Sequence, residues 1–358
     1  MSTALGARSQ SLPVDELINT RGAVQQADGF IVGCVIARDS SRMAFATGEG
    51  IVHVTPRRGA AEHWRRLEVH DGAALALAQD VTPQGFLTGG DDNRLCRIDA
   101  DDAVHEMAAG RRWVEHVASV ADGRTVLIAA ATGKQVELRD GTGALQRTLD
   151  HDSTVSGVVF DARGKRIATS HYGGATLRFV NTKADAPRLL AWKGSHIGIA
   201  LHPAGEALVT AMQENELHGW RLPDGHNMRM SGYPQKTQSI SFSRSGRWLA
   251  TSGADAVVLW PFFGGGPMGK PPTELAGIAN VLCTRVAFHP QHDVVAAGFA
   301  DGTVLMADVA TKRVLPVCGP HGSAGHAAVS ALAYSPDGSC LAFGTEGGRM
   351  AVIDLSVK

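Results

Sequence analysis

The chain has 358 residues, and its 34 Lys and Arg nearly balance its 35 Asp and Glu, which gives a formal net charge of −1 at pH 7. Such a chain lacks the concentrated basic field that nucleic acids and anionic membranes require, so neither is expected as a partner. Apolar residues make up 44% of the sequence and there are 42 glycines. This composition is typical of many short buried strands joined by turns.

Five cysteines lie scattered along the sequence, without the close pairs of a redox or zinc motif: Cys34, Cys96, Cys283, Cys318 and Cys340. An odd, scattered set indicates a reducing compartment rather than a disulfide framework. The N-terminal residues lack the apolar core of a secretory signal, and no run is long enough to span a bilayer. We therefore expect a cytoplasmic protein. More Arg than Lys, with abundant Ala and Gly, suggests a GC-rich bacterial source.

In chain order, residues 1–21 are rich in Ser and other polar residues and are expected to form a flexible tail, whereas residues 22–358 are expected to form one domain. Residues 22–26 have the pattern of a short strand with no hairpin partner before it. From residue 30 onward, apolar runs alternate with turns that recur about every 40 to 45 residues. The eight units are 30–69, 70–108, 110–149, 151–192, 194–230, 233–275, 279–317 and 324–354.

The last unit has the clearest pattern of the eight. Three alternating apolar runs within 329–353 are separated by turns at 336–338 and 347–348. Period-two alternation broken by such turns indicates three short antiparallel strands. Because a fourth strand is missing, we predict that residues 22–26 supply it and close the ring of units. The alternative is a frayed N-terminal tail.

This last unit resembles a WD repeat of the β-propeller family. The resemblance rests on Gly325-His326 and on the turn at 335–338, and residues 242–260 resemble the family closely as well. The Trp-Asp pair that names the family is replaced, as at 353–354. The resemblance implies an all-β fold, a single closed propeller of four-stranded antiparallel blades. We expect eight blades, with seven as the alternative, and a buried network of His, Ser or Thr, Asp and Trp within a blade.

In a propeller of this type, the loops that join each outer strand to the next inner strand share one face with the loops between second and third strands. We call this the top face and the opposite one the bottom face. The resemblance implies that partners bind the top face, where Tyr, Trp and Arg would dominate the binding energy. The candidate partner-binding residues there are Arg111, Arg112, Trp113, Tyr172, Trp192, Lys193 and Tyr233. Alternatively, Trp113 and Trp192 pack between blades and the arginines are solvated.

Acidic and histidine residues have simpler interpretations. Tight hairpins favour Asp beside Gly or Asn, because its side chain bonds its own backbone. The residues of this kind are Asp91, Asp92, Asp255 and Asp301. The close pairs His289/His292 and His321/His326 do not have the ligand spacing of a metal motif, and Pro290 excludes helical spacing in the first pair, so no metal site is expected.

An insertion at 261–272 is expected to be a flexible Gly-rich loop whose exposed Phe262 and Phe263 could anchor a partner. Its glycines are not followed by the Gly-Lys-Ser/Thr of a phosphate loop, and the sequence has no Gly-x-Ser-x-Gly nucleophile elbow. We therefore expect no enzyme and no cofactor. The favoured function is a non-catalytic scaffold for an unidentified protein partner. The alternative is a propeller enzyme or small-ligand binder that uses the central channel.

Overall fold

The computed structural model describes residues 16–182, 186–322 and 326–356. Residues 1–15, which make up most of the expected tail, lie outside the described residues. The end of that tail is a short helix, α1 (Glu16–Arg21), which was not predicted. Its buried Ile18 packs in a cluster with Val317 and Ile353, so α1 lies against the last two units.

The strands follow the units in chain order. Those of units one to three are β2 (Ile31–Ile36), β3 (Arg42–Thr47), β4 (Ile51–Pro56), β5 (Arg65–Glu68), β6 (Ala74–Gln79), β7 (Phe86–Gly90), β8 (Arg94–Ile98), β9 (Val104–Ala109), β10 (His116–Asp122), β11 (Thr125–Thr132), β12 (Gln135–Asp140) and β13 (Leu145–Asp150). Those of units four and five are β14 (Val155–Phe160), β15 (Arg166–Phe179), β16 (Arg188–Leu201), β17 (Ala207–Met212), β18 (Leu217–Arg221) and β19 (Asn227–Met230).

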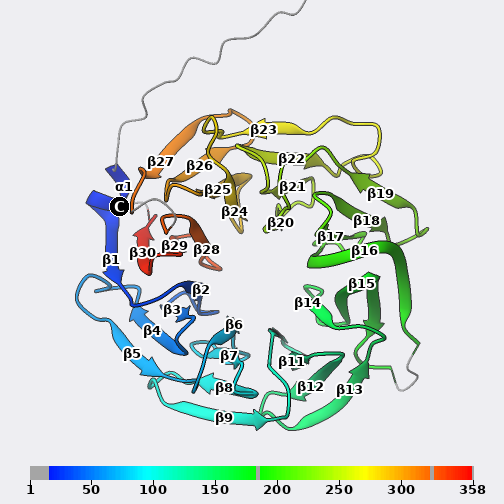
Figure 1. Ribbon diagram of the computed structural model, residues 1–358, viewed down its shortest axis with the longest axis horizontal. Helices are drawn as coiled ribbons and strands as arrows, with labels where there is room; N and C mark the ends of the chain where they lie inside the picture. Colours follow the sequence, from blue (N-terminus) through cyan, green and yellow to red (C-terminus); the bar gives the residue numbers. More distant parts are fainter. Residues whose placement is uncertain (1–15, 183–185, 323–325, 357–358) are drawn as a thin grey trace, which may run out of the picture.

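The remaining strands belong to units six to eight and to the N-terminal segment. They are β20 (Ile240–Phe242), β21 (Trp248–Thr251), β22 (Val257–Pro261), β23 (Thr273–Leu275), β24 (Cys283–Phe288), β25 (Val294–Phe299), β26 (Val304–Asp308), β27 (Val314–Cys318), β28 (Val329–Tyr334), β29 (Cys340–Thr345), β30 (Arg349–Asp354) and β1 (Gly22–Gln26). The sheets stand in a ring, with the first strand of each unit towards the centre (Figure 1). This is an all-β propeller of antiparallel sheets.

The described residues form seven continuous sheets: six of four strands, and one of six strands that runs from β14 to β19. The expectation of eight separate blades is thus corrected to seven, the number given as the alternative. The physical reason lies in β15 and β16, which have 14 residues each and take part in two pairings. β15 pairs with β14 and then with β16, whose second half pairs with β17. Units four and five therefore share one sheet.

The N-terminal strand closes the ring. β1 pairs antiparallel with β30, and Gly22 lies opposite Ile353. The resulting sheet has the order β1-β30-β29-β28, so the first strand of the chain is the outer strand of the last blade. The predicted role of residues 22–26 is confirmed, and β30 is not left as an unpaired edge.

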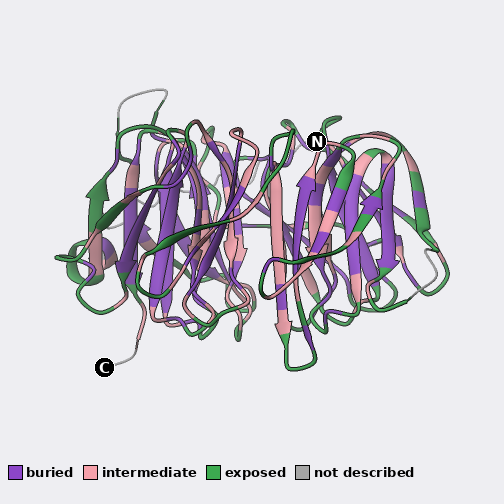
Figure 2. Cartoon of the chain, turned by 90° about the horizontal axis from the view of Figure 1, so that it is seen from below, coloured by how far each residue is buried: buried purple, intermediate pink, exposed green. Residues whose placement is uncertain are grey.

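The core lies between neighbouring sheets. The middle strands β3 and β29 are buried at all positions, whereas the outer strand β5 is largely exposed. Figure 2 shows the same division, with buried residues in the strands and exposed ones in the loops at both faces. Phe45 and Phe343 are fully buried, and each such side chain stabilises the fold by about 1.5 to 3 kcal/mol.

Polar groups on the bottom face connect adjacent units. The ring Nε2 of His202 lies 3.0 Å from the carbonyl oxygen of Gly246, and that of His289 lies 3.0 Å from the carbonyl oxygen of Gly338. Arg166 donates to the carbonyl oxygen of Gly205 at 3.2 Å in the same way. A basic side chain near the first turn of one unit thus bonds the first turn of the next unit, which connects neighbouring units at this face.

The buried polar network implied by the family resemblance is present in parts. In unit two, His70 lies 2.9 Å from both Thr88 Oγ1 and Asp92 Oδ1. Unit six instead uses a tyrosine, because the hydroxyl of Tyr233 accepts a bond from the indole of Trp260 at 2.6 Å. The same hydroxyl lies 2.7 Å from Thr251 Oγ1. Tyr233 thus occupies the place of the histidine and is buried, so it offers little surface to a partner.

Candidate interaction surface

The loop between β9 and β10 carries three of the candidate residues. Its ends are fixed to the hairpin of unit two, because the Gly110 and Val114 amides donate to backbone carbonyls of that hairpin at 2.9 and 3.0 Å. Between these anchors, Arg111, Arg112 and Trp113 are exposed on the top face, and 56% of the Trp113 surface is accessible to solvent. Trp113 therefore does not pack between blades.

Tyr172 lies at the tip of a tight turn within β15. The two halves of this strand fold back on each other, since the Val180 amide donates to the Lys165 carbonyl at 3.0 Å. The turn continues through Gly173, whose φ of +86° is accessible to glycine at little cost. The Tyr172 carbonyl accepts a bond from the Ser153 hydroxyl at 3.2 Å. The backbone is thus held while the side chain, which is 70% exposed, extends into solvent.

Trp192 and Lys193 lie where unit four passes into unit five. The Trp192 indole stacks on the His218 ring with 3.9 Å between centroids, and its carbonyl oxygen lies 3.0 Å from His196 Nε2. Trp192 is half-buried as a result, whereas Lys193 is exposed. The structure therefore brings one further cation, rather than a second free aromatic ring, to this part of the top face.

The insertion of unit six lies on the bottom face and differs from the expectation. Phe262 is buried against Phe242 in the core, which corrects the prediction that both phenylalanines are exposed. Phe263 is 39% exposed, and the Arg247 and Lys270 cations lie over its ring at 5.1 and 4.8 Å. Lys270 also bonds carbonyl oxygens of the loop, so the loop is closed by its own lysine.

A cavity of about 480 Å³ opens beside the β9–β10 loop, between units two and three. Its rim is cationic, with the side chains of Arg111, Arg112 and Lys134, and its floor includes the apolar Leu95 and Val114. The volume falls within the range of about 300 to 1,000 Å³ that is typical of ligand sites. Arg111 and Arg112 of the rim were candidates from the sequence. The cavity itself is formed by the packing of two units and could not be predicted from a sequence motif.

His151 lies at the edge of this cavity. Its Nε2 is 2.9 Å from Thr169 Oγ1, whereas its buried Nδ1 has no hydrogen-bond partner. Burial, together with the nearby Arg178 and His171, lowers the pKa of His151 to about 4. The imidazole is therefore neutral at pH 7, and the positive charge of the cavity comes from its Arg and Lys residues.

Other reactive groups serve the fold. Asp92 and Asp301 accept bonds from the amides of Arg94 and Thr303 at 3.1 and 2.9 Å, as expected of hairpin carboxylates. Burial raises the pKa of the Cys283 thiol to about 12, which leaves little of the nucleophilic thiolate at pH 7. Within the described ranges, no group of three or more His, Cys, Asp or Glu side chains is placed to hold a metal ion. Nor do these ranges contain a helix long and apolar enough to cross a membrane.

Two similarities to known proteins agree with this fold. Residues 283–358 match the family model described as the anaphase-promoting complex subunit 4 WD40 domain. Over 234 residues, the chain is 24% identical to Telomerase protein component 1 of Mus musculus, and the match covers 63% of this chain and 8% of the mouse protein. The chain thus spans a small fraction of that relative. Both matches support a WD-repeat β-propeller, generally a protein-interaction fold, and neither bears on the expected bacterial source.

Proposed function

We propose that this protein is a non-catalytic scaffold that binds a partner protein on its top face, over units three to five. The observation that carries the proposal is the exposure of two large aromatic side chains, Trp113 and Tyr172, on backbone that hydrogen bonds hold in place. Such side chains bury a large area on binding and lose little conformational entropy. A rigid ring beneath them lowers the ordering cost of association.

Charged residues complete the proposed surface. Arg111 and Arg112 precede Trp113 on the same loop. Lys193 is exposed on the connection between units four and five. Arginine is enriched among residues that dominate interfaces, because its planar group makes forked hydrogen bonds. Tyr233 is left out of the surface because it is buried, and Trp192 contributes only its exposed edge.

The alternative, chemistry in the central channel, has less support. Side chains of the inner strands bond neighbouring sheets, which leaves fewer of them to act on a ligand. The Ser330 hydroxyl donates to the Ile31 carbonyl at 2.6 Å, and Arg285 donates to the Ser330 carbonyl at 2.6 Å. We therefore place the function on the top face. The proposed scaffold requires neither a cofactor nor a metal, and we place it in the cytoplasm.

Affinity capture from a native lysate tests the proposal. The wild-type protein and a Trp113→Ala/Tyr172→Ala variant serve as baits side by side, and co-purified proteins are quantified by mass spectrometry. We expect a stoichiometric protein with the wild type that is depleted at least about tenfold with the variant, which corresponds to a loss of about 1.4 kcal/mol or more. Circular dichroism melts establish that the variant is folded.

The matched control is Phe179→Ala, since Phe179 is 56% exposed like Trp113 but lies at the bottom end of β15. This control should capture the partner as the wild type does. A partner retained by the top-face variant, or lost equally with Phe179→Ala, would contradict the proposed surface. If the wild-type bait enriches no protein, the scaffold function itself is contradicted.

A further inference from the structure

We propose that the cavity between units two and three receives an acidic peptide segment of the partner, with carboxylates at its rim and an apolar side chain on its floor. The inference rests on the proposed function and adds the chemistry of the bound segment. The cavity opens next to the exposed Trp113 and is lined by both arginines of the same loop.

The rim of the cavity is positively charged. Among the described residues, no carboxylate forms an ion pair with the side chains of Arg111, Arg112 or Lys134, and all three are exposed. The fourth cation of the lining, Arg139, is already paired with Glu137 at 2.5 Å. The lining also holds Asp150, which accepts a bond from Gln135 at 2.9 Å. With four cations and two carboxylates, the lining keeps a net charge of +2, which complements a run of carboxylates.

The floor of the cavity is apolar. Leu95, Val114 and Ala130 line the cavity and also belong to the cluster of buried residues between units two and three. These three side chains are almost fully buried. The accessible apolar surface of the floor comes from the partly exposed Ala108 and the exposed Ala109 of the same lining. A segment with alternating carboxylate and apolar residues would match both surfaces, because an apolar side chain gains from removal of this floor from water.

The backbone beside these cations is ordered before binding. Arg112 lies across the turn at Gly133, where an added Cβ would come within 3.0 Å of Arg112 Nη1. Gly133 has a φ of +61°, and its carbonyl accepts the Val155 amide at 2.8 Å, so the turn is fixed. The next residue, Lys134, accepts the His151 amide at 2.9 Å through its carbonyl. An ordered backbone of this kind reduces the ordering cost of binding.

The same charges do not favour a nucleic acid. A nucleic-acid site needs a basic stripe that follows many phosphates, whereas this chain has a net charge of −1 and the excess positive charge of the site is confined to one cavity. A cavity with a closed apolar floor suits a side chain of a peptide better than a continuous phosphate backbone. The occupant we assign is therefore a carboxylate-rich peptide.

A peptide array tests the assignment while the partner is still unidentified. Each sequence of a randomised Leu-containing library is printed twice, once with Asp and Glu and once with Asn and Gln. Fluorescently labelled protein is applied at low and at physiological salt. We expect the wild type to bind the acidic members at least about tenfold more strongly than their amide counterparts. The preference should weaken as salt screens the charges.

Arg111→Gln/Arg112→Gln is the test variant, and Arg163→Gln/Arg244→Gln is its control. The control removes the same charge from two exposed arginines in bottom-face turns. The preference for acidic members should disappear in the test variant and persist in the control. Equal binding of acidic and amide members, or a preference that survives in the test variant, would overturn the proposal. Stronger binding of a single-stranded DNA spotted on the same array would also overturn it, in favour of a general polyanion site.

The array and the lysate capture can fail separately. If the lysate experiment yields a partner that depends on Trp113 but the array shows no acidic preference, the scaffold stands and the peptide assignment falls. If the array shows the preference but no partner is captured, the cavity binds acidic peptides while the proposed scaffold function is contradicted.

Discussion

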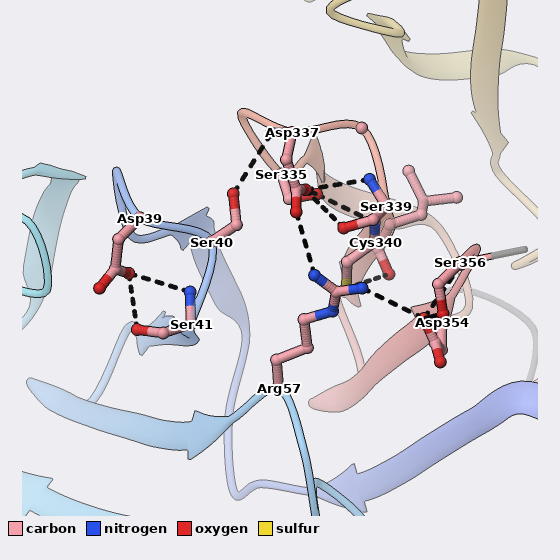
Figure 3. Close-up of polar contacts among 12 residues, drawn as sticks. Asp39, Ser40, Ser41, Arg57, Ser335, Asp337, Ser339, Cys340, Asp354 and Ser356 are labelled. Carbon is pink, nitrogen blue, oxygen red and sulfur yellow. Dashed lines mark hydrogen bonds and ion pairs between the residues drawn. The ribbon is translucent and has the colours of Figure 1, made fainter.

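Arg57 Nη1 donates to Asp337 Oδ2 at 3.0 Å across a separation of 280 residues, at the junction of the first and last units (Figure 3). Its second terminal nitrogen lies 3.5 Å from Asp354 Oδ1. Although burial alone would raise the pKa of Asp337, bonds from the Ser335 and Ser339 hydroxyls and the Arg57 charge hold it well below its usual range. One arginine of the first unit therefore connects a turn and a strand end of the last unit.

Replacing Arg57 should weaken the junction of the ring. In Arg57→Gln, both ion pairs are lost, and the cost should be at most about 1 kcal/mol because the two carboxylates are largely exposed. A melting temperature lower by about 2 °C is expected in a thermal unfolding scan. Arg58→Gln is the control, since Arg58 is exposed and forms no ion pair within the described residues. Identical melts for the two variants would contradict a role for the Arg57 ion pairs.

How much of the fold the sequence predicts depends on whether the determinants are local. The strand at 22–26 was predictable because the last unit has three strands where the pattern requires four. The number of sheets was not, because β16 continues from unit four into unit five and Tyr172 pairs with Ser195 across that boundary, which apolar alternation does not predict. α1 was missed because its six residues gain their stability from Ile18 packing on distant strands.

The candidate site divides in the same way. Exposed loop residues such as Trp113 and Tyr172 were identified from residue type and position alone. Tyr233 and Phe262 were placed on the surface because loops are usually exposed, yet their rings fill space between sheets that only tertiary packing creates. The cavity floor beneath Arg112 has no counterpart in the linear sequence for the same reason.

The Tyr233 hydroxyl should contribute to stability although it lies near the surface loops. Tyr233→Phe removes the group that accepts the Trp260 indole and contacts Thr251. It leaves the buried indole N–H without this partner, whereas Thr251 still donates to the Val258 carbonyl at 3.1 Å. We expect a loss of about 1 to 3 kcal/mol in the free energy of unfolding, measured by urea titration. Tyr172→Phe deletes the same atom from an exposed ring and should change the free energy by less than about 0.5 kcal/mol. Equal effects of the two substitutions would argue against the buried network.

Substitution of Gly338 should destabilise the fold through a clash with the His289 ring as well as through backbone strain. Its φ is +74°, and an added Cβ would come within 2.3 Å of the His289 ring. Gly338→Ala should therefore displace the ring that lies 3.0 Å from the Gly338 carbonyl oxygen, at a cost of about 2 kcal/mol or more. Gly123 also has a positive φ, but nothing lies within 4 Å of its added Cβ, so Gly123→Ala measures backbone strain alone. Comparable urea midpoints for both variants would show that the connection between units matters little.

Acid should destabilise the fold through its buried histidines, and His151 gives the sharpest test. Its pKa is lowered to about 4 by burial and by Arg178 and His171, whereas an unfolded chain has an unperturbed value near about 6.5. The unfolded state thus binds the proton first as pH falls. The stability that the neutral ring contributes is fully present above about pH 6.5 and is lost progressively towards pH 4.

Urea titrations at several pH values between about 7 and 4.5 measure this effect. His151→Gln should lower stability at neutral pH, because the contact with Thr169 is lost, but it should flatten the decline by up to about 1.4 kcal/mol per pH unit. The exposed His226 provides the control, and His226→Gln should leave the wild-type slope unchanged. A slope that His151→Gln does not alter would mean that other groups, such as the buried His70 and His196, account for the acid sensitivity. Those rings also have a pKa lowered by burial and lie in other units, so the same titration applied to His196→Gln would then locate the source.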